Sequence, residues 1–417
     1  MNPELLFTQA LGLTSPWAVD DIDFDPKAQR IDFRVSCEAK QLPCPGCGRS
    51  DQPIHDRKPR TWRHLDFFQF AAYVHAEVPR VRCGGCKKTT QVEVPWARPG
   101  SRFTLLFEAF ALTLAKAMPV STTARQLRTD DRALWRVLDH HVTQAQARED
   151  YSTVTTIRVD ETACRRGHHY ITLVHDLAER RLIFATPGRD AQTLKGFSED
   201  LASHQGKADQ IRHASIDMSK AYISGLGQHL PNAEITFDRF HIIQLANQAV
   251  DAVRKSEVRH DARLKRTKWA WLTDMARWSK KQDEAVYDLT RSNLKTARAW
   301  RIKEALRDIF QAKPGREQAE GLLKRWHSWA RRCRLEPMKQ LAATIKRHWA
   351  GVLQGFESGL SNGYVEAMNS LIQAAKARAR GYGTASHFIA ICFLIAGKLK
   401  HLPANPFQTP LQRMVAS

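Results

Sequence analysis

A chain of 417 residues is long enough for two or three domains, and a hydrophobic content of 43% excludes wholesale disorder. The net charge of +21 indicates a polyanionic partner, usually nucleic acid, although a generally basic surface would give the same charge. Residues 1–12 lack the basic start of a signal peptide and the apolar run 388–396 is too short to span a bilayer, so we expect a cytosolic protein with no membrane partner.

The first hundred residues combine short strands with two cysteine pairs. Alternating apolar and polar side chains in residues 1–40 predict strands that lead into the first pair. Clustered cysteines in a reducing compartment indicate a metal site rather than disulfides, and two thiolates on each of two tight turns complete a tetrahedral zinc site. We therefore predict a domain of residues 1–100 with a structural Zn²⁺ held by Cys44, Cys47, Cys83 and Cys86.

The interval between the two cysteine pairs is longer than in common zinc ribbons. This length predicts a β-hairpin inserted between the two turns. Two alternatives remain open at this stage. The four cysteines could be unligated, or His55 or His64 could replace one of them as a ligand.

Residues 101–150 are expected to form a helix-turn-helix. A helix over 103–118 should end at Pro119, and Ser121 should cap the short helix that follows it. A longer helix is expected over 131–147.

The outer face of this longer helix is basic. The second helix of such a pair can enter the major groove of DNA, where arginines reach phosphates or guanines. We predict DNA contacts from Arg125, Arg132 and Arg136. An ordinary helical linker would have similar spacing, and this alternative also stays open.

Residues 151–241 have the pattern of an α/β fold. Apolar segments predict three consecutive strands with short turns, followed by helix, strand, helix and strand. The strands are expected at 155–159, 169–175, 181–186, 211–216 and 234–237, and the helices at 191–204 and 220–230.

A basic helical block follows. No glycine or proline occurs between Leu245 and Lys313, which predicts helices. Residues 251–350 contain 26 Lys and Arg against 12 Asp and Glu, together with seven of the eleven tryptophans. We expect this block to clamp DNA, with most tryptophans in its core and one or two at the DNA. Further helices are expected at 362–379, after a Ser361 cap, and at 385–399.

Three carboxylates stand out by their position. Asp160 and Asp217 each end an apolar strand, which places them at a sheet edge. Glu366 lies on a later helix, whose polar face it shares with Asn362, Asn369 and Gln373. Carboxylates on rigid elements suit two divalent ions in a phosphoryl-transfer site. The 43 acidic residues allow many such triples, so residue type alone selects none of them.

The chain resembles the ISL-three family of bacterial insertion-sequence transposases along nearly its whole length. Many ordered segments carry the resemblance. They are Cys44-Pro-Gly-Cys47, Thr61-Trp-Arg-His-Leu-Asp66, Arg80-Val-Arg-Cys83, Val94-Pro-Trp-Ala-Arg-Pro-Gly100, Val159-Asp-Glu-Thr162, Gly167-His-His-Tyr170, Asp217-Met-Ser-Lys-Ala-Tyr222, Phe237-Asp-Arg-Phe-His241 and Ser361-Asn-Gly-Tyr-Val-Glu-Ala-Met-Asn369.

The resemblance implies an RNase H-like catalytic fold over 151–241 and 356–417, interrupted by an all-helical insertion at 242–355. It assigns a catalytic Asp-Asp-Glu triad, holding Mg²⁺ or Mn²⁺, to Asp160, Asp217 and Glu366. Asp238 and His241 resemble an Asp-x-x-His motif that supports such sites. Ala367 departs from the glycine expected after the glutamate.

The implied activity is DNA transposition. The resemblance implies metal-dependent hydrolysis at the element ends, followed by attack of the 3′-hydroxyl on target DNA, by a homodimer on paired ends in the bacterial nucleoid. Two rival functions remain: a DNA-binding regulator that no longer cuts, and an RNase H-fold nuclease without strand transfer. Glu161 and Asp176 either support the site or are solvated strand ends, and the second interpretation is favoured.

Overall fold

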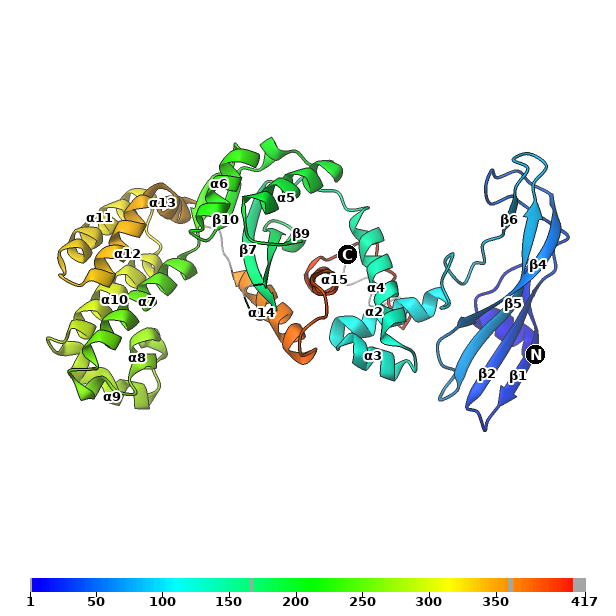
Figure 1. The fold of residues 1–417 in the computed structure, drawn as a ribbon, viewed down its shortest axis with the longest axis horizontal. Coiled ribbons are helices and arrows are strands. Elements are labelled where there is room, and N and C mark those ends of the chain that lie inside the picture. The colour runs from blue at the N-terminus through cyan, green and yellow to red at the C-terminus, as the bar shows by residue number, and fades with distance from the viewer. Residues whose placement is uncertain (1, 166, 168, 359–362, 408–417) are drawn as a thin grey trace. The chain divides into compact units, whose positions relative to one another are not determined.

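A computed structural model describes residues 2–165, 167, 169–358 and 363–407 (Figure 1). The expected Ser361 cap and the start of its helix at Asn362 lie outside these residues. The chain forms two compact units. The first unit contains the described residues up to 145 together with those from 400 to 407, and the second unit contains residues 146–399.

The first unit contains a six-stranded sheet. Its order is β1 (Trp17–Asp25), β2 (Arg30–Cys37), β5 (Ala71–Arg82), β4 (Gln52–Arg63) and β3 (Gln41–Leu42), with β6 (Thr89–Gln91) paired to β5, and helix α1 (Pro3–Ala10) precedes β1. Strands β4 and β5 pair antiparallel, so the hairpin expected between the cysteine pairs is confirmed. Three tryptophans, Trp17, Trp62 and Trp96, pack edge to face in its core.

Three helices follow this sheet: α2 (Leu105–Ala117), α3 (Val120–Gln126) and α4 (Asp131–Gln146). The expected Ser121 cap is wrong, because α3 begins at Val120 directly after Pro119 and Ser121 lies inside its first turn. Proline fixes its own backbone angle and starts the helix without a side-chain cap. Asp130 instead caps α4, since its Oδ1 accepts from the Ala133 amide at 2.7 Å.

The second unit is built on a five-stranded sheet. Its order is β11 (Glu234–Phe237), β10 (His213–Ile216), β7 (Thr156–Arg165), β8 (His169–Asp176) and β9 (Arg181–Pro187). Strand β8 runs antiparallel to both of its neighbours, β7 and β9, whereas β10 and β11 run parallel to β7. The order of strands and helices expected for 151–241 is thus confirmed.

Helices cover both faces of this second sheet (Figure 1). Helices α5 (Ala191–Ser203) and α6 (Lys220–His229) lie on one face, and α14 (Gly363–Arg378) and α15 (Ala385–Ala396) lie on the other. Leu194, Phe197 and Leu201 of α5 are fully buried, as their helical spacing predicts. Among the described residues, no helix is both long and apolar enough to cross a membrane.

Seven helices lie between β11 and α14 within the described residues. They are α7 (Arg239–Glu257), α8 (Lys268–Leu272), α9 (Lys280–Arg291), α10 (Lys295–Ala312), α11 (Arg316–Arg332), α12 (Glu336–Arg347) and α13 (Trp349–Glu357). Helix α13 packs on the edge strand so closely that a Cβ on Gly351 would lie 2.5 Å from the Phe237 ring. The helical block therefore shares a continuous hydrophobic core with the sheet.

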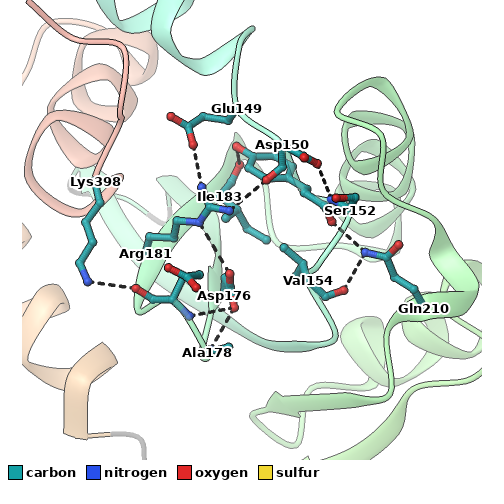
Figure 2. Close-up of polar contacts among 12 residues, drawn as sticks. Glu149, Asp150, Ser152, Val154, Asp176, Ala178, Arg181, Ile183, Gln210 and Lys398 are labelled. Carbon is teal, nitrogen blue, oxygen red and sulfur yellow. Dashed lines mark hydrogen bonds and ion pairs between the residues drawn. The ribbon is translucent and has the colours of Figure 1, made fainter. Parts of the chain in front are cut away.

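A buried arginine holds the start of the second unit on its sheet (Figure 2). Arg181 Nη1 donates to Glu149 Oε2 at 2.6 Å, and Arg181 Nε lies 3.6 Å from Asp176 Oδ2. Both carboxylates are almost fully buried, at 2% and 1% exposure. The favoured interpretation of Asp176 as a solvated strand end is therefore wrong, because it belongs to a buried ion pair in the β8–β9 hairpin.

Candidate metal centres and nucleic-acid interface

The four cysteines of the first unit converge on one point. Their Sγ atoms all lie within 4.8 Å of one another. The Sγ atoms of Cys44 and Cys86 lie 3.8 Å apart, and those of Cys47 and Cys83 lie 3.4 Å apart. Four sulfurs around one Zn²⁺, each about 2.3 Å from it, lie about 3.8 Å apart in a tetrahedron. The cluster therefore has the size and the chemistry of a closed zinc site.

The two cysteine turns have the same backbone pattern. The amides of Cys44 and Cys83 donate to the carbonyls five residues later, at 2.9 and 3.0 Å. Positions four after each cysteine, Gly48 and Lys87, both have positive φ, at 74° and 60°. The amides of Cys86 and Gly85 donate to Cys83 Sγ, and these bonds lower the pKa of Cys83 to about 6. The second turn thus favours the Cys83 thiolate, whereas in the first turn the bond from the Arg49 backbone is outweighed by Cys83 and Cys44, which raise the pKa of Cys47 to about 11.

Neither histidine considered as a replacement ligand belongs to the cluster. His55 is exposed on β4. His64 is bonded through Nδ1 to Thr104 Oγ1 at 2.9 Å, beside the start of α2, and burial lowers its pKa to about 4. A neutral His64 therefore helps to position α2 against the sheet.

Helices α3 and α4 present the expected basic face. Arg125, Arg132 and Arg136 are all exposed, whereas Leu134, Val137 and Leu138 of α4 are buried. Arg128, in the turn between the helices, has a φ of 52° and pairs with Asp66. The arginines are therefore carried by a pair of helices that is fixed to the rest of the first unit.

A buried carboxylate fastens α2 to α4. Glu108 is 0% exposed, and it accepts hydrogen bonds from Arg98 at 2.9 Å, from His141 at 2.6 Å and from Ser101 at 2.6 Å. Burial alone would raise the pKa of Glu108, but the bonds from His141, Ser101 and Arg98 outweigh it and hold that pKa below its ordinary value.

Two of the acidic candidates lie level with each other on neighbouring strands. Ser215 of β10 pairs with Arg158 of β7 in parallel register, so Asp217 and Asp160 lie two residues further along each strand. The expectation that Asp160 ends its strand is wrong, because β7 continues to Arg165 by pairing with β8. Asp217 does follow the end of β10, and its Oδ1 accepts from the Ser219 amide at 2.9 Å.

A buried arginine beneath these carboxylates was not predicted. Arg158, at 2% exposure, pairs with Asp238 Oδ2 at 2.7 Å and reaches Asp160 Oδ2 at 3.4 Å. Asp238 is 1% exposed and also caps α7 through the Phe240 amide at 2.9 Å. The signal in the sequence is a charge inside an otherwise apolar strand, Ile157-Arg-Val. Arg158 thus links β7 to the junction between β11 and α7.

His241, the other member of the Asp-x-x-His motif, is half-buried on the first turn of α7. Its Nδ1 lies 3.3 Å from Gln244 Oε1. A positive charge on its ring would lower the pKa of Glu161 of β7. The two members of the motif therefore lie in different surroundings, since Asp238 is enclosed by Arg158 and His241 is near the surface.

Helix α14 runs alongside β7 in the same direction. Asn369 Nδ2 donates to Asp160 Oδ2 at 2.7 Å, and further along Gln373 donates to Thr162 and Lys376 to the Ala163 carbonyl. Glu366 precedes Asn369 by three residues and is exposed. It therefore lies about 4.5 Å further back along the same helix face.

The acidic residues are less tightly gathered than the cysteines. Within the described part of the chain, the four cysteines are the one group of three or more His, Cys, Asp or Glu side chains with ligand atoms within 4.8 Å of one another. Glu161, half-buried on β7, lies 3.7 Å from Arg189. Burial, Asp217 and Asp160 raise the pKa of Glu161, so negative charge does accumulate here.

The helical block exposes two of its seven tryptophans strongly. Trp269 is 65% exposed and Trp329 is 45% exposed, whereas Trp271, Trp300 and Trp326 are buried. Lys268 lies over the Trp269 ring at 4.7 Å from its centroid. The expectation that most of these tryptophans pack inside the block agrees with this burial.

Three family models match consecutive parts of the chain. Residues 157–392 match the DDE domain of ISL3, described as "Transposase". Residues 92–142 match the "Helix-turn-helix domain of transposase family ISL3". Residues 40–86 match the "zinc-finger of transposase IS204/IS1001/IS1096/IS1165". The zinc-finger match and the four-cysteine cluster together support a structural Zn²⁺.

Whole-length relatives agree with these models. The transposase for insertion sequence element IS1557 of Mycobacterium tuberculosis is 29% identical, over 96% of this chain and 97% of the relative. The transposase for insertion sequence element IS1001 of Bordetella parapertussis is 26% identical, over 91% of this chain and 95% of the relative. The chain belongs to the ISL3 family of insertion-sequence transposases, with a helix-turn-helix that binds DNA.

Proposed function

We propose that this transposase uses Asp160, Asp217 and Glu366 to hold divalent metal, Mg²⁺ or Mn²⁺, and with it cuts and joins DNA. One observation carries the proposal. Asp160 and Asp217 each follow the paired residues Arg158 and Ser215 of neighbouring parallel strands by two positions, and Asn369 joins α14 to Asp160 at 2.7 Å. Glu366 lies three residues before Asn369, and this helical spacing puts both side chains on one face of α14.

The chemistry of the donors fits a hard cation. Carboxylate oxygens are the ligands that Mg²⁺ takes in phosphoryl-transfer sites. Beside them, Asn369 Oδ1 is buried and has no hydrogen-bond partner among the described atoms. A buried oxygen without a donor is costly unless a cation or water satisfies it. Asn369 is therefore a further oxygen at which a bound ion or its water would be favourable.

The proposed reaction has two phosphoryl transfers: water cuts the strand at each element end, and the freed 3′-hydroxyl attacks target DNA in line. Bound metal would activate the attacking oxygen and stabilise the leaving one. The protein's own groups hold the carboxylates. Arg158 of the same strand and Asn369 of α14 hold Asp160, and the Ser219 amide holds Asp217.

An RNase H-like fold is part of this proposal. Its support is a sheet of three antiparallel strands followed by two strands parallel to the first. The helical block, taken as an insertion of residues 242–355, separates this part from the helix that carries Glu366. Asp238 then supports the site through Arg158. His241 contributes to the field at Glu161.

We propose that element ends are recognised by Arg125, Arg132 and Arg136, and that the basic helical block clamps DNA. Trp269 and Trp329 are the two strongly exposed tryptophans of the block, and with the exposed Tyr287 they are available to a base. A homodimer on paired ends would bring two sites to two strands. Such a protein would act on double-stranded DNA, at element ends and target, in the nucleoid of the bacterial cytoplasm.

Strand cleavage by an amide variant tests the catalytic assignment. Asp217→Asn keeps the side-chain shape and removes an anionic ligand, so cleavage and joining of end DNA should collapse while DNA binding survives. Asp209→Asn, an exposed carboxylate of the same unit, is the matched control and should retain both. Joining at near wild-type rate by Asp217→Asn would overturn the assignment.

The same assay separates the two rival functions. A regulator that no longer cuts would bind end DNA without metal-dependent cleavage. A nuclease would cut it and yield no strand-transfer product. The transposase proposal requires both cleaved ends and joined target DNA from the wild-type protein.

A further inference from the structure

A groove in the second unit lies between the β7–β8 hairpin and the C-terminal end of α14. Its volume is about 1050 Å³. Its lining contains three cationic and two aromatic side chains: Arg165, Lys376, Arg380, Tyr170 and Tyr382. None of its described lining residues is acidic. This groove is separate from the helix-turn-helix and from the helical block, because none of its described lining residues belongs to either of them.

The charge of the groove suits a polyanion. Three of its side chains are cationic, and one of them, Lys376, also donates to the Ala163 carbonyl and so joins α14 to β7. Arg165 and Arg380 are exposed on the two sides of the groove. Cations on both walls, without a carboxylate, favour a chain of phosphates between them.

Both aromatic rings of the groove contact neighbouring side chains. The Arg189 guanidinium lies 4.4 Å from the centroid of the Tyr170 ring. The Tyr382 ring stacks on Phe388, with centroids 5.4 Å apart and an angle of 19° between the planes. Rings fixed in this way are platforms on which unpaired bases stack without regard to sequence.

The position and size of the groove point to a single strand. Ala163, at its border, is three residues past Asp160 on β7, about 10 Å away. This distance corresponds to about three nucleotides of a stacked strand. The volume is at the upper end of the roughly 300–1,000 Å³ of small-molecule pockets. A few nucleotides of a single strand would fill it.

We propose that this groove binds an unpaired DNA strand beside the proposed cleavage site. Arg165, Lys376 and Arg380 contact its phosphates, and Tyr170 and Tyr382 stack on its bases. The inference rests on the proposed function, because the strand enters from the position of Asp160. It assigns to α14 a second role, that of guiding one strand away from the carboxylates.

Binding by the full chain tests the groove without cleavage. The probes are a fluorescent end-DNA duplex with a five-nucleotide unpaired extension, on either strand, and the same duplex with blunt ends, without added divalent metal. Wild-type protein should bind one extended probe more tightly. Tyr382→Ala should weaken that binding roughly 5- to 100-fold, the size of one lost stacking contact, and leave the blunt probe unchanged.

Arg380→Ala provides a second variant with little risk to folding, because Arg380 is exposed. It should also lose the preference for the extended probe. Arg378→Ala, at the last residue of α14 and outside the groove lining, is the control and should keep it. The inference is overturned if wild-type protein binds the blunt probe and each extended probe equally. It is also overturned if Arg378→Ala and Arg380→Ala lose the same affinity for the extended probe. Metal-dependent cleavage by such a protein would leave the proposed function standing.

Discussion

The cysteine centre and the acidic centre of this transposase are assembled in different ways. The cysteines come from two equivalent turns joined by one hairpin, and their sulfurs lie within 4.8 Å of one another. The carboxylates of the proposed acidic centre come from β7, the turn after β10, and α14, and Glu366 follows Asp217 by 149 residues (366 − 217). Local backbone geometry is enough to form the first centre, whereas the proposed second centre requires long-range packing.

The largest loss of stability is expected from removing one ligand of the cysteine centre. Cys83→Ser removes one of four thiolates, and structural zinc contributes about 10–16 kcal/mol to the folding of small zinc domains. We expect loss of bound zinc and unfolding around β3 to β6, with the second unit still folded. Zinc content and thermal unfolding measure this. Cys333→Ser, outside the cluster, is the control, and normal zinc content in Cys83→Ser would refute the site.

The acidic centre should depend on Arg158 instead of on zinc. Arg158→Met leaves Asp238 buried without its charged partner, at a cost of about 3–5 kcal/mol. Urea unfolding measures this loss. Lys195→Met is the matched control, because the Lys195–Glu199 pair is exposed and should contribute little. A similar small loss for both variants would show that Arg158 does not hold the carboxylates.

Glu108 differs from the carboxylates of the proposed acidic centre, because its hydrogen bonds come from protein groups alone. Its pKa is lowered in the folded state, so it stabilises the fold above the unfolded pKa of about 4.3, and this stability is lost as the pH falls through the folded value. Glu108→Gln should be less stable than wild type at pH 7. The difference in unfolding free energy should shrink below pH 4.5, and a difference independent of pH would contradict this account.

The sequence predicts those features of the fold that depend on residues close together in the chain, and it does not predict those that depend on distant residues. The cysteine turns, the basic face of α4 and the strand order depend on neighbours in the chain, and they follow from spacing. The extension of β7 to Arg165 depends on pairing with β8, and the Asn369–Asp160 contact joins residues 209 apart. A pattern within one segment cannot predict such partners. It could only mark Arg158 and Asn369 as polar side chains that need one.

A smaller effect is expected from Arg136→Ala, which tests whether the first unit recognises DNA independently of the proposed chemistry of the second unit. Arg136→Ala should reduce discrimination between end DNA and random DNA by about 1–3 kcal/mol if this side chain contacts a base. Cleavage of DNA already bound should be unchanged. Competition binding at fixed salt measures the discrimination. Arg148→Ala, beyond α4, serves as the control, and an equal loss on both DNAs would make Arg136 a phosphate contact.

Binding of Mn²⁺ to the full chain with end DNA tests most directly whether the dispersed carboxylates form one centre. Glu366 is the decisive residue, because it is exposed and comes from the helix that returns after the helical block. Titration calorimetry should show Mn²⁺ binding by wild type and by Asp209→Asn. Binding should be lost in Asp160→Asn, Asp217→Asn and Glu366→Gln alike. Unchanged Mn²⁺ affinity in Glu366→Gln would contradict the shared site.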